Sequence, residues 1–355
     1  MSSCSLRVEF DDSRRSYEPG QEIRGRVVVM VDKDVTCKKL EITQVWKTHG
    51  RGNAQMRCLD RALHASPEWS AGRQYAYPFS FRAPAMPLTY HGNLLNVDHY
   101  VDATADIPWA RDPRASEDYV LTPGPNSHRD YLATPPDFTK QGTEPASGCA
   151  RALGWILLPL IIVLLVGLAV FILPIALIVL VVGYVRRRAA ESKLGPVDVT
   201  LNAPLLPEPA DTTSKAHRVA AAFTSGSKRK RAGKHVIIPG QVVQFTIAFT
   251  PPGALEITRI SARVGAEESV RAGSGTDAKT FTHQIWQQDL ELSGSMSPPA
   301  GMPVRRTVEV AFPDVPAYSF EITDNKLSWT MSVRVDIPHW PDWVRDVAIV
   351  MIPRD

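Results

Sequence analysis

The feature that most constrains this chain is an uninterrupted apolar run near its middle, Leu153–Val185. Its 33 residues include no charged residue and none of Asn, Gln, His, Ser or Thr. A stretch of about 18 or more apolar residues is typical of a segment that enters a bilayer. The sequence therefore predicts a membrane-anchored protein with a soluble region on either side of the run.

The length of the run allows more than one way of entering the bilayer. As one straight helix it would extend roughly 50 Å, against a hydrocarbon core of about 30 Å. Folded near Gly167, each leg would measure about 24 Å, slightly less than a full crossing. Pro159 and Pro174 lie inside the run, and each removes a backbone donor and bends its helix. Length alone leaves open a single span, a membrane hairpin and a hairpin buried in a soluble core.

The flanks of the run favour the hairpin. Arg186, Arg187 and Arg188 follow it directly, so a single span would place the C-terminal flank in the cytoplasm. Roughly 150 preceding residues would then have to cross the membrane, although the start MSSCSLRVEF has no basic n-region and no apolar h-region. We therefore expect a helical hairpin with both soluble regions facing the cytoplasm. Trp155 is the expected interfacial anchor, and Tyr184 lies at the other end of the run.

Both soluble regions are predicted to be all-β. Short segments with two-residue apolar alternation are bounded by turn residues, and no sustained helical period occurs outside the run. This pattern is typical of a β-sandwich. The longer predicted strands are Ile23–Val31, Leu40–Trp46, Tyr75–Phe81, Val197–Leu201, Val242–Phe249, Leu255–Val264, Phe281–Trp286, Arg305–Phe312 and Trp329–Val335.

The two regions also share sequence anchors in the same order, which predicts an internal duplication. Each region opens a strand with Pro-Gly-Gln and carries Leu-Glu-Ile-Thr, a Phe/Pro/Tyr cluster and Asp-Ile-Pro. The matched sets are Pro19–Gln21 with Pro239–Gln241; Leu40–Thr43 with Leu255–Thr258; Phe81, Pro84, Pro87 and Tyr90 with Phe312, Pro313, Pro316 and Tyr318; and Asp106–Trp109 with Asp336–Pro338 and Trp340.

The first region resembles the arrestin family. That family has a Tyr-x-Pro-Gly-x-x-(aliphatic)-x-Gly turn leading into a strand, and Tyr77–Phe81 with the following prolines and the strand Asp98–Ile107 also fit it. The turn residues are Tyr17, Pro19, Gly20, Ile23 and Gly25. The resemblance covers about 1–125 and 195–355 and includes bacterial sporulation-control relatives.

The resemblance implies a fold and a class of function. The fold would be two immunoglobulin-like β-sandwiches in tandem. The protein would be a non-catalytic adaptor or scaffold that binds a membrane-protein partner, with strand addition at a sheet edge as the natural recognition mode. Two features depart from the family: arrestins have a short linker where this chain has the apolar run, and Pro135–Phe138 lacks the tyrosine of a Pro-Pro-x-Tyr motif.

Together these observations divide the chain into five segments. They are an N-terminal sandwich over 1–125, a proline-rich linker over 126–152, the membrane segment over 153–185, a basic linker over 186–194 and a C-terminal sandwich over 195–355.

No catalytic motif is present, and we expect neither enzymatic activity nor a cofactor. The chain has no GxSxG, HExxH or phosphate-binding glycine loop. His91 and His99 lie near Asp98 and Asp102, a set compatible with a metal or acid–base site. The simpler interpretation, which we favour, is a turn residue beside a half-exposed strand.

Basic residues indicate lipid contact rather than nucleic-acid binding. The formal net charge is only +3, and no aromatic residues alternate with the basic run Lys228, Arg229, Lys230, Arg231. This run and Arg186–Arg188 are candidates for contact with anionic headgroups. They support an alternative function, a membrane-shaping or lipid-binding protein that acts through the hairpin and the basic loop.

Tryptophans and cysteines complete the candidate residues. Most tryptophans lie on strand patterns and are expected in the core, whereas Trp340 and Trp343 are expected to form an exposed partner-contact patch. All four cysteines precede the apolar run, which favours free thiols in a reducing compartment. Cys149 lies next to the run, as a plain thiol or as an acylation site.

Overall fold

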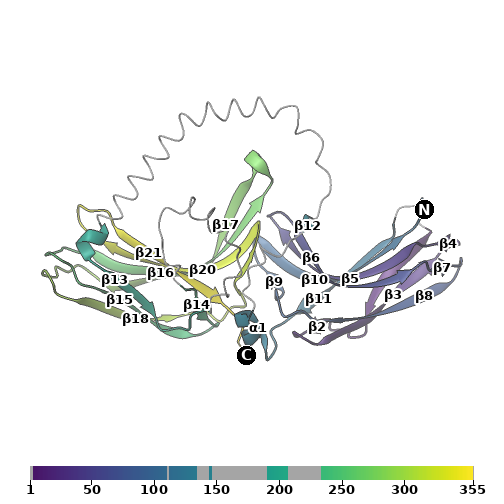
Figure 1. Cartoon of the computed structure of the whole chain (residues 1–355), viewed down its shortest axis with the longest axis horizontal. Helices are drawn as coiled ribbons and strands as arrows, with labels where there is room; N and C mark the ends of the chain where they lie inside the picture. The colour runs from purple at the N-terminus through teal and green to yellow at the C-terminus, as the bar shows by residue number, and fades with distance from the viewer. Residues whose placement is uncertain (1–2, 110–111, 134–143, 146–189, 207–232, 355) are drawn as a thin grey trace, which may run out of the picture.

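The computed structural model describes residues 3–109, 112–133, 144–145, 190–206 and 233–354. Two β-sandwiches lie side by side along the long axis, and the chain end marked C lies at their junction (Figure 1). The expected tandem of β-sandwiches is thereby confirmed. Within these residues no helix has the length and apolar character required to cross a bilayer. The predicted membrane segment 153–185, with its proposed hairpin, lies outside the described residues.

The N-terminal sandwich packs a three-stranded sheet, β1-β3-β8, against a larger sheet, β12-β6-β5-β10-β11-β2. Alternate residues of β10 are buried along its whole length, as expected for a strand with one face on the core. The elements are β1 (Cys4–Phe10), β2 (Ser16–Tyr17), β3 (Glu22–Val31), β4 (Val35–Thr36), β5 (Lys39–Gly50), β6 (Gln55–Ala65), β7 (Glu68–Trp69), β8 (Gln74–Arg82), β9 (Tyr90–His91), β10 (Leu95–Asp106), β11 (Arg114–Leu121), α1 (Ser127–Ala133) and β12 (Glu144–Pro145).

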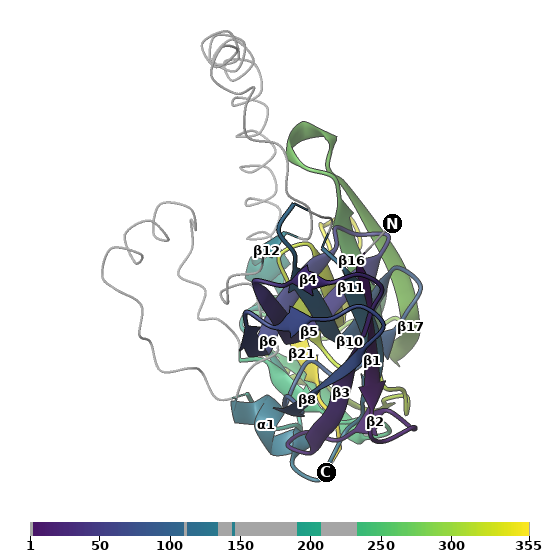
Figure 2. The ribbon, with the colours of Figure 1, turned by 90° about the vertical axis from the view of Figure 1, so that its right-hand side faces the viewer.

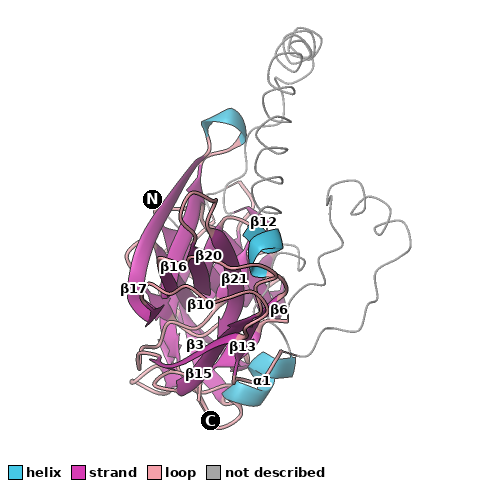
Figure 3. Ribbon diagram, turned by 90° about the vertical axis from the view of Figure 1, so that its left-hand side faces the viewer, coloured by secondary structure: helices cyan, strands magenta, loops and turns pink. Residues whose placement is uncertain are grey.

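The C-terminal sandwich has the same two-layer design, with β13-β15-β18 facing β14-β21-β20-β16-β17. Figure 3 shows this sandwich end-on, with short helical pieces at its rim. Its elements are β13 (Val197–Leu201), β14 (His235–Ile237), β15 (Val242–Phe249), β16 (Arg259–Ala272), a 3₁₀ turn η1 (Gly275–Asp277), β17 (Lys279–Ser293), β18 (Val304–Ala311), β19 (Phe320–Ile322), β20 (Asn325–Asp336) and β21 (Trp343–Met351).

The strand order shows that the two sandwiches repeat one topology. The order β6-β5-β10-β11-β2 corresponds to β17-β16-β20-β21-β14, and β9 and β19 pair with the equivalent strands β10 and β20. The last pair of each sheet, β11 with β2 and β21 with β14, is parallel, whereas the other pairs of these sheets are antiparallel. Agreement in order and in direction supports the duplication that the sequence anchors predict.

The Pro-Gly-Gln anchor forms the same turn in both sandwiches. Gly20 and Gly240 have positive φ angles of 83° and 71°, which a residue with a Cβ rarely adopts. The Gln21 side-chain oxygen accepts a hydrogen bond from the Glu18 backbone N–H at 3.0 Å, and Gln241 accepts one from the Ile238 N–H at the same distance. The turn therefore fixes the start of β3 and of β15 by one mechanism.

The predicted match between the two Leu-Glu-Ile-Thr segments is wrong. Strand register places Leu40 opposite Ala105 and Ile260 opposite Val335, so the equivalent of Leu40 is Ile260 rather than Leu255. Register likewise matches Tyr90 with Phe320 rather than Tyr318. Alternating sequences match one another at many offsets, because a period of two repeats every second residue.

The segment expected to be a linker after residue 125 contains structure. Helix α1 begins at Ser127, and its Tyr131 is buried. Strand β12 then pairs with the edge strand β6. On the far side of the apolar run, residues 190–194 are helical, and both Ala190 and Leu194 are buried. Figure 2 shows α1 and β12 beside the N-terminal sandwich.

Candidate functional site at the junction between the sandwiches

The centre of the junction is a buried carboxylate, Glu268 on β16. It has no exposed surface, and its three hydrogen-bond donors all come from the N-terminal sandwich. The Tyr90 hydroxyl donates to Oε1 at 2.7 Å, and the backbone N–H groups of Asn93 and Leu94 donate to Oε2 at 3.1 and 2.8 Å. Burial, followed by the hydrogen bond to Glu268, raises the pKa of Tyr90 far above its usual value, so Tyr90 remains a donor.

Gly92 makes this approach possible. A Cβ at Gly92 would overlap the Glu268 carboxylate and contact the Tyr90 hydroxyl. The turn between β9 and β10 thus presents backbone where other residues would present a side chain. We call Glu268 with its three donors the carboxylate clamp.

A second set of polar contacts lies beside the carboxylate clamp. The Asn53 side chain exchanges two hydrogen bonds with the Gly273 backbone, at 2.9 and 3.0 Å. Asn325, which is 2% exposed, donates to the Thr48 hydroxyl at 3.1 Å and to the Asn53 carbonyl at 2.8 Å. Side-chain amides paired in this way orient the two sandwiches, because each hydrogen bond has a preferred direction.

These contacts are related by approximate two-fold symmetry. Thr48 in β5 lies opposite Val97, and Glu268 in β16 lies opposite Leu327. Thr48 and Glu268 therefore occupy equivalent positions in the two sandwiches. Both Thr48 and Glu268 are buried, and each bonds to the opposite sandwich. The two sandwiches therefore contact each other through equivalent surfaces, as the subunits of a two-fold dimer do.

Aromatic rings complete the packing. Trp46 and Phe320 meet edge to face, with centroids 6.0 Å apart. The Arg51 guanidinium lies 3.9 Å from the centre of the Phe281 ring. On another side of the junction, Tyr131 of α1 contacts the ring of Tyr318. Apolar and cation–π contacts thus add to the polar bonds that join the two sandwiches.

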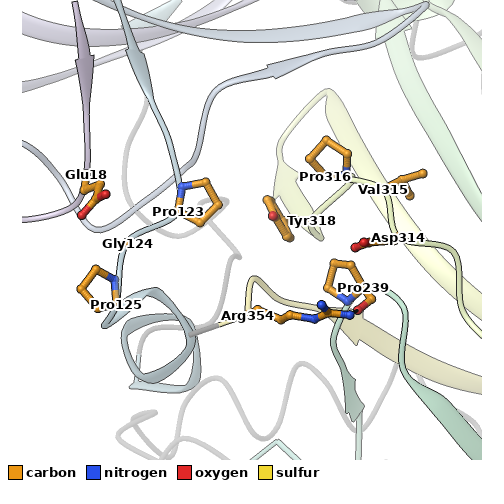
Figure 4. Close-up of a pocket in the computed structure, with 10 residues that line it drawn as sticks. All are labelled: Glu18, Pro123, Gly124, Pro125, Pro239, Asp314, Val315, Pro316, Tyr318 and Arg354. Atoms are coloured by element: carbon orange, nitrogen blue, oxygen red, sulfur yellow. Dashed lines mark hydrogen bonds between the residues drawn. The ribbon is translucent and has the colours of Figure 1, made fainter.

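A pocket of about 580 Å³ opens at the junction, near α1 and the chain end. Figure 4 shows that its walls come from both sandwiches. Arg354 donates to the Pro239 carbonyl at 2.5 Å and closes one side. The lining residues are Glu18, Pro123, Gly124, Pro125, Pro239, Asp314, Val315, Pro316, Tyr318 and Arg354.

The histidines and aspartates considered for a metal or acid–base site do not assemble into one. His99 is fully buried and bonds to the Pro87 carbonyl at 2.8 Å, and burial lowers its pKa to about 4. Asp102 pairs with Lys47 at 2.8 Å. Asp98 contacts His91 at 2.7 Å and also His49, which the sequence pattern did not indicate. Among the described residues, no group of three or more His, Cys, Asp or Glu is arranged to hold a metal ion.

Of the two tryptophans predicted to form an exposed partner-contact patch, one is exposed and one is buried. Trp340 is 44% exposed, and the Lys193 ammonium lies 4.4 Å from its ring centre. Trp343 is buried at 5% exposure because it begins β21 with its side chain in the core, so its prediction as an exposed contact is wrong. The sequence missed Trp109 as a surface residue: it is fully exposed and has a positive φ of 60°, as His339 does at 62° in the matching turn.

Other predicted site residues lie outside the described residues. They are Trp155, Pro159, Gly167, Pro174, Tyr184, Arg186, Arg187, Arg188, Lys228, Arg229, Lys230 and Arg231. Cys149 lies outside as well, whereas Cys4 and Cys37 are buried and Cys58 is exposed.

Comparison with known proteins gives partial likenesses to solved structures. No family model and no curated protein matches the chain. The sporulation control protein Spo0M from Bacillus subtilis matches over 35% of this chain with 16% sequence identity and a TM-score of 0.31. The match spans 51% of Spo0M, about half its length.

Proposed function

We propose that this chain is a non-catalytic adaptor or scaffold, anchored in the membrane by Leu153–Val185, with both sandwiches on the cytoplasmic side. The observation that carries this proposal is the junction. The carboxylate clamp joins a residue before the apolar run to a residue after it. Domains in direct contact lie on one side of a bilayer, so a run that enters the membrane must return to the side it left.

The described surfaces also suit a binding role. β17, 15 residues long, ends its sheet in the described part of the chain, and an extended peptide adds to such an edge through main-chain hydrogen bonds. The resemblance of the sequence to arrestins supports an adaptor role, by analogy of fold rather than of site. The partner would be a membrane protein, because the anchor holds the sandwiches close to the bilayer.

The test of this proposal is the accessibility of one cysteine on each sandwich. Asn126 and Thr276 are exposed, on the N-terminal and C-terminal sides of the run, and Asn126→Cys or Thr276→Cys would be placed in a chain lacking Cys58 and Cys149. Cys4 and Cys37 remain, since both are buried. An impermeant thiol reagent should label neither site in intact cells and both after lysis.

Labelling of a single site in intact cells would establish a single span and refute the proposal. Labelling of both would place the sandwiches outside the cell, which also contradicts it. A membrane protein that copurifies with the intact chain after cross-linking in native membranes would then identify the partner.

A further inference from the structure

The pocket at the junction has walls of unusual composition. Pro123 and Pro125 line it from the N-terminal sandwich, and Pro239 and Pro316 from the C-terminal one (Figure 4). Proline has no backbone N–H, so these walls offer rigid apolar rings and few donors. A ligand would therefore contact them through apolar groups rather than through main-chain pairing.

The charges of the pocket favour a cation. Glu18 and Asp314 lie in opposite sandwiches, and neither carboxylate has an ion pair or hydrogen bond with another described side chain. Among the described lining residues Arg354 is the only basic one, and it already donates to the Pro239 carbonyl. Two available carboxylates therefore outnumber one engaged guanidinium, and the pocket has a net negative charge.

A side chain that combines an apolar stem with a cationic head fits both properties. Lysine and arginine lay their methylene groups along apolar surface while the charged end reaches polar partners. Arginine additionally pairs with carboxylates through two parallel hydrogen bonds. We propose that this pocket, which we call the proline pocket, binds an arginine or lysine side chain from an extended basic segment of a partner protein.

The source of that segment follows from the location of the chain, and in this respect the inference rests on the proposed function. Cytoplasmic loops of membrane proteins carry an excess of lysine and arginine close to their membrane spans. An adaptor held at the cytoplasmic surface would meet such loops first. The proline pocket thus selects the basic juxtamembrane loop of a membrane-protein partner, and the junction of the two sandwiches forms the receptor.

The experiment measures binding of a peptide to the full chain in nanodiscs of neutral phosphatidylcholine. The probe is a fluorescein-labelled, end-blocked Gly-Pro-Arg-Pro-Gly peptide, and in its control the arginine is replaced by neutral citrulline. We expect saturable binding of the arginine peptide by fluorescence anisotropy and binding of the citrulline peptide weakened by about fivefold or more, since each charged contact contributes on the order of 1 kcal/mol.

Two double variants separate the pocket from general charge attraction. The double variant Glu18→Gln with Asp314→Asn should bind the arginine peptide about fivefold or more weakly, by the same estimate. Glu256→Gln with Asp277→Asn changes the net charge equally on exposed sites outside the lining and should bind as the wild type does.

Three results would overturn the inference: no saturable binding by the wild type, equal loss in the two double variants, or equal affinity for the arginine and citrulline peptides. Circular dichroism confirms that each variant is folded. The cysteine-labelling result does not depend on this pocket, so the inference and the proposed function fail separately.

Discussion

Glu268 obtains all its hydrogen-bond donors from the neighbouring sandwich. A buried carboxylate without such donors would be costly, and three donors at 2.7 to 3.1 Å satisfy both of its oxygens. The two-residue alternation of β16 places this residue on the buried face, between Ala266 and Val270. No local pattern predicts what satisfies the carboxylate there, because the donors are about 175 residues away in sequence.

We predict that Glu268→Gln destabilises the protein. The glutamine amide keeps one acceptor oxygen, and its NH₂ group faces a donor of the N-terminal sandwich. At least one hydrogen bond is therefore lost, and two donor groups are left facing each other. The free energy of unfolding should fall by about 1–3 kcal/mol in urea denaturation. Glu267→Gln, the half-buried neighbour, is the matched control and should change it by less than about 0.5 kcal/mol. Equal effects of the two substitutions would contradict the carboxylate clamp.

His99 gives the N-terminal sandwich a dependence on pH. Its pKa is about 4 in the folded chain, below the usual 6.5, because it is buried. The unfolded chain therefore binds the proton first. The stabilisation is complete above pH 6.5 and is lost as the pH falls from 6.5 toward 4.

The measurement compares the wild type with His99→Gln, whose amide can still donate to the Pro87 carbonyl. Between pH 7.5 and pH 5 the wild type should lose about 2 kcal/mol more unfolding free energy than the variant. Parallel pH profiles for the two proteins would show that His99 does not carry this dependence.

At the scale of elements, Gly25 shows how one strand determines the packing of its neighbours. β3 runs between β1 and β8, and Gly25 lies opposite Phe10 and Phe79. A Cβ there would overlap the Glu9 carbonyl and the Phe79 ring. A glycine inside a strand often marks a bend or a bulge, but the β3 register is continuous here. The glycine serves close packing instead.

We therefore expect Gly25→Ala to lower the free energy of unfolding by about 1–3 kcal/mol, the usual cost of overpacking. Gly253→Ala is the control, because no atom lies within 4 Å of the added methyl group. Its effect should remain within about 0.5 kcal/mol. A neutral Gly25→Ala, measured by thermal or urea denaturation, would indicate that Phe79 moves aside at little cost.

The strands themselves were largely predictable, and their pairing was not. Val197–Leu201 and Val242–Phe249 coincide with β13 and β15, because one face of each is buried and the alternation is clean. The prediction Leu255–Val264 begins too early and ends too soon relative to β16, because an isolated bridge at Ile257 precedes the strand. The Pro-Gly-Gln turns located the repeat correctly because they depend on local geometry alone.

For the molecule as a whole, the sequence predicted two similar β-domains but did not predict how they meet. The residues of the junction are an asparagine, a threonine, a glutamate and glycines, which also occur in ordinary exposed turns. Their role appears only when two distant hairpins are brought together. The proline pocket has the same origin, since no single segment contains more than three of its lining residues in a row.

The approximate two-fold symmetry of the junction has a consequence for mass action. Two separate subunits joined by such contacts would dissociate on dilution, whereas here both halves belong to one chain and their association is intramolecular. The balance between joined and separated sandwiches is therefore independent of how many copies the cell holds. A substitution that weakens the junction would change that balance equally at low and at high protein concentration, and a ligand that bridges both sandwiches would restore it.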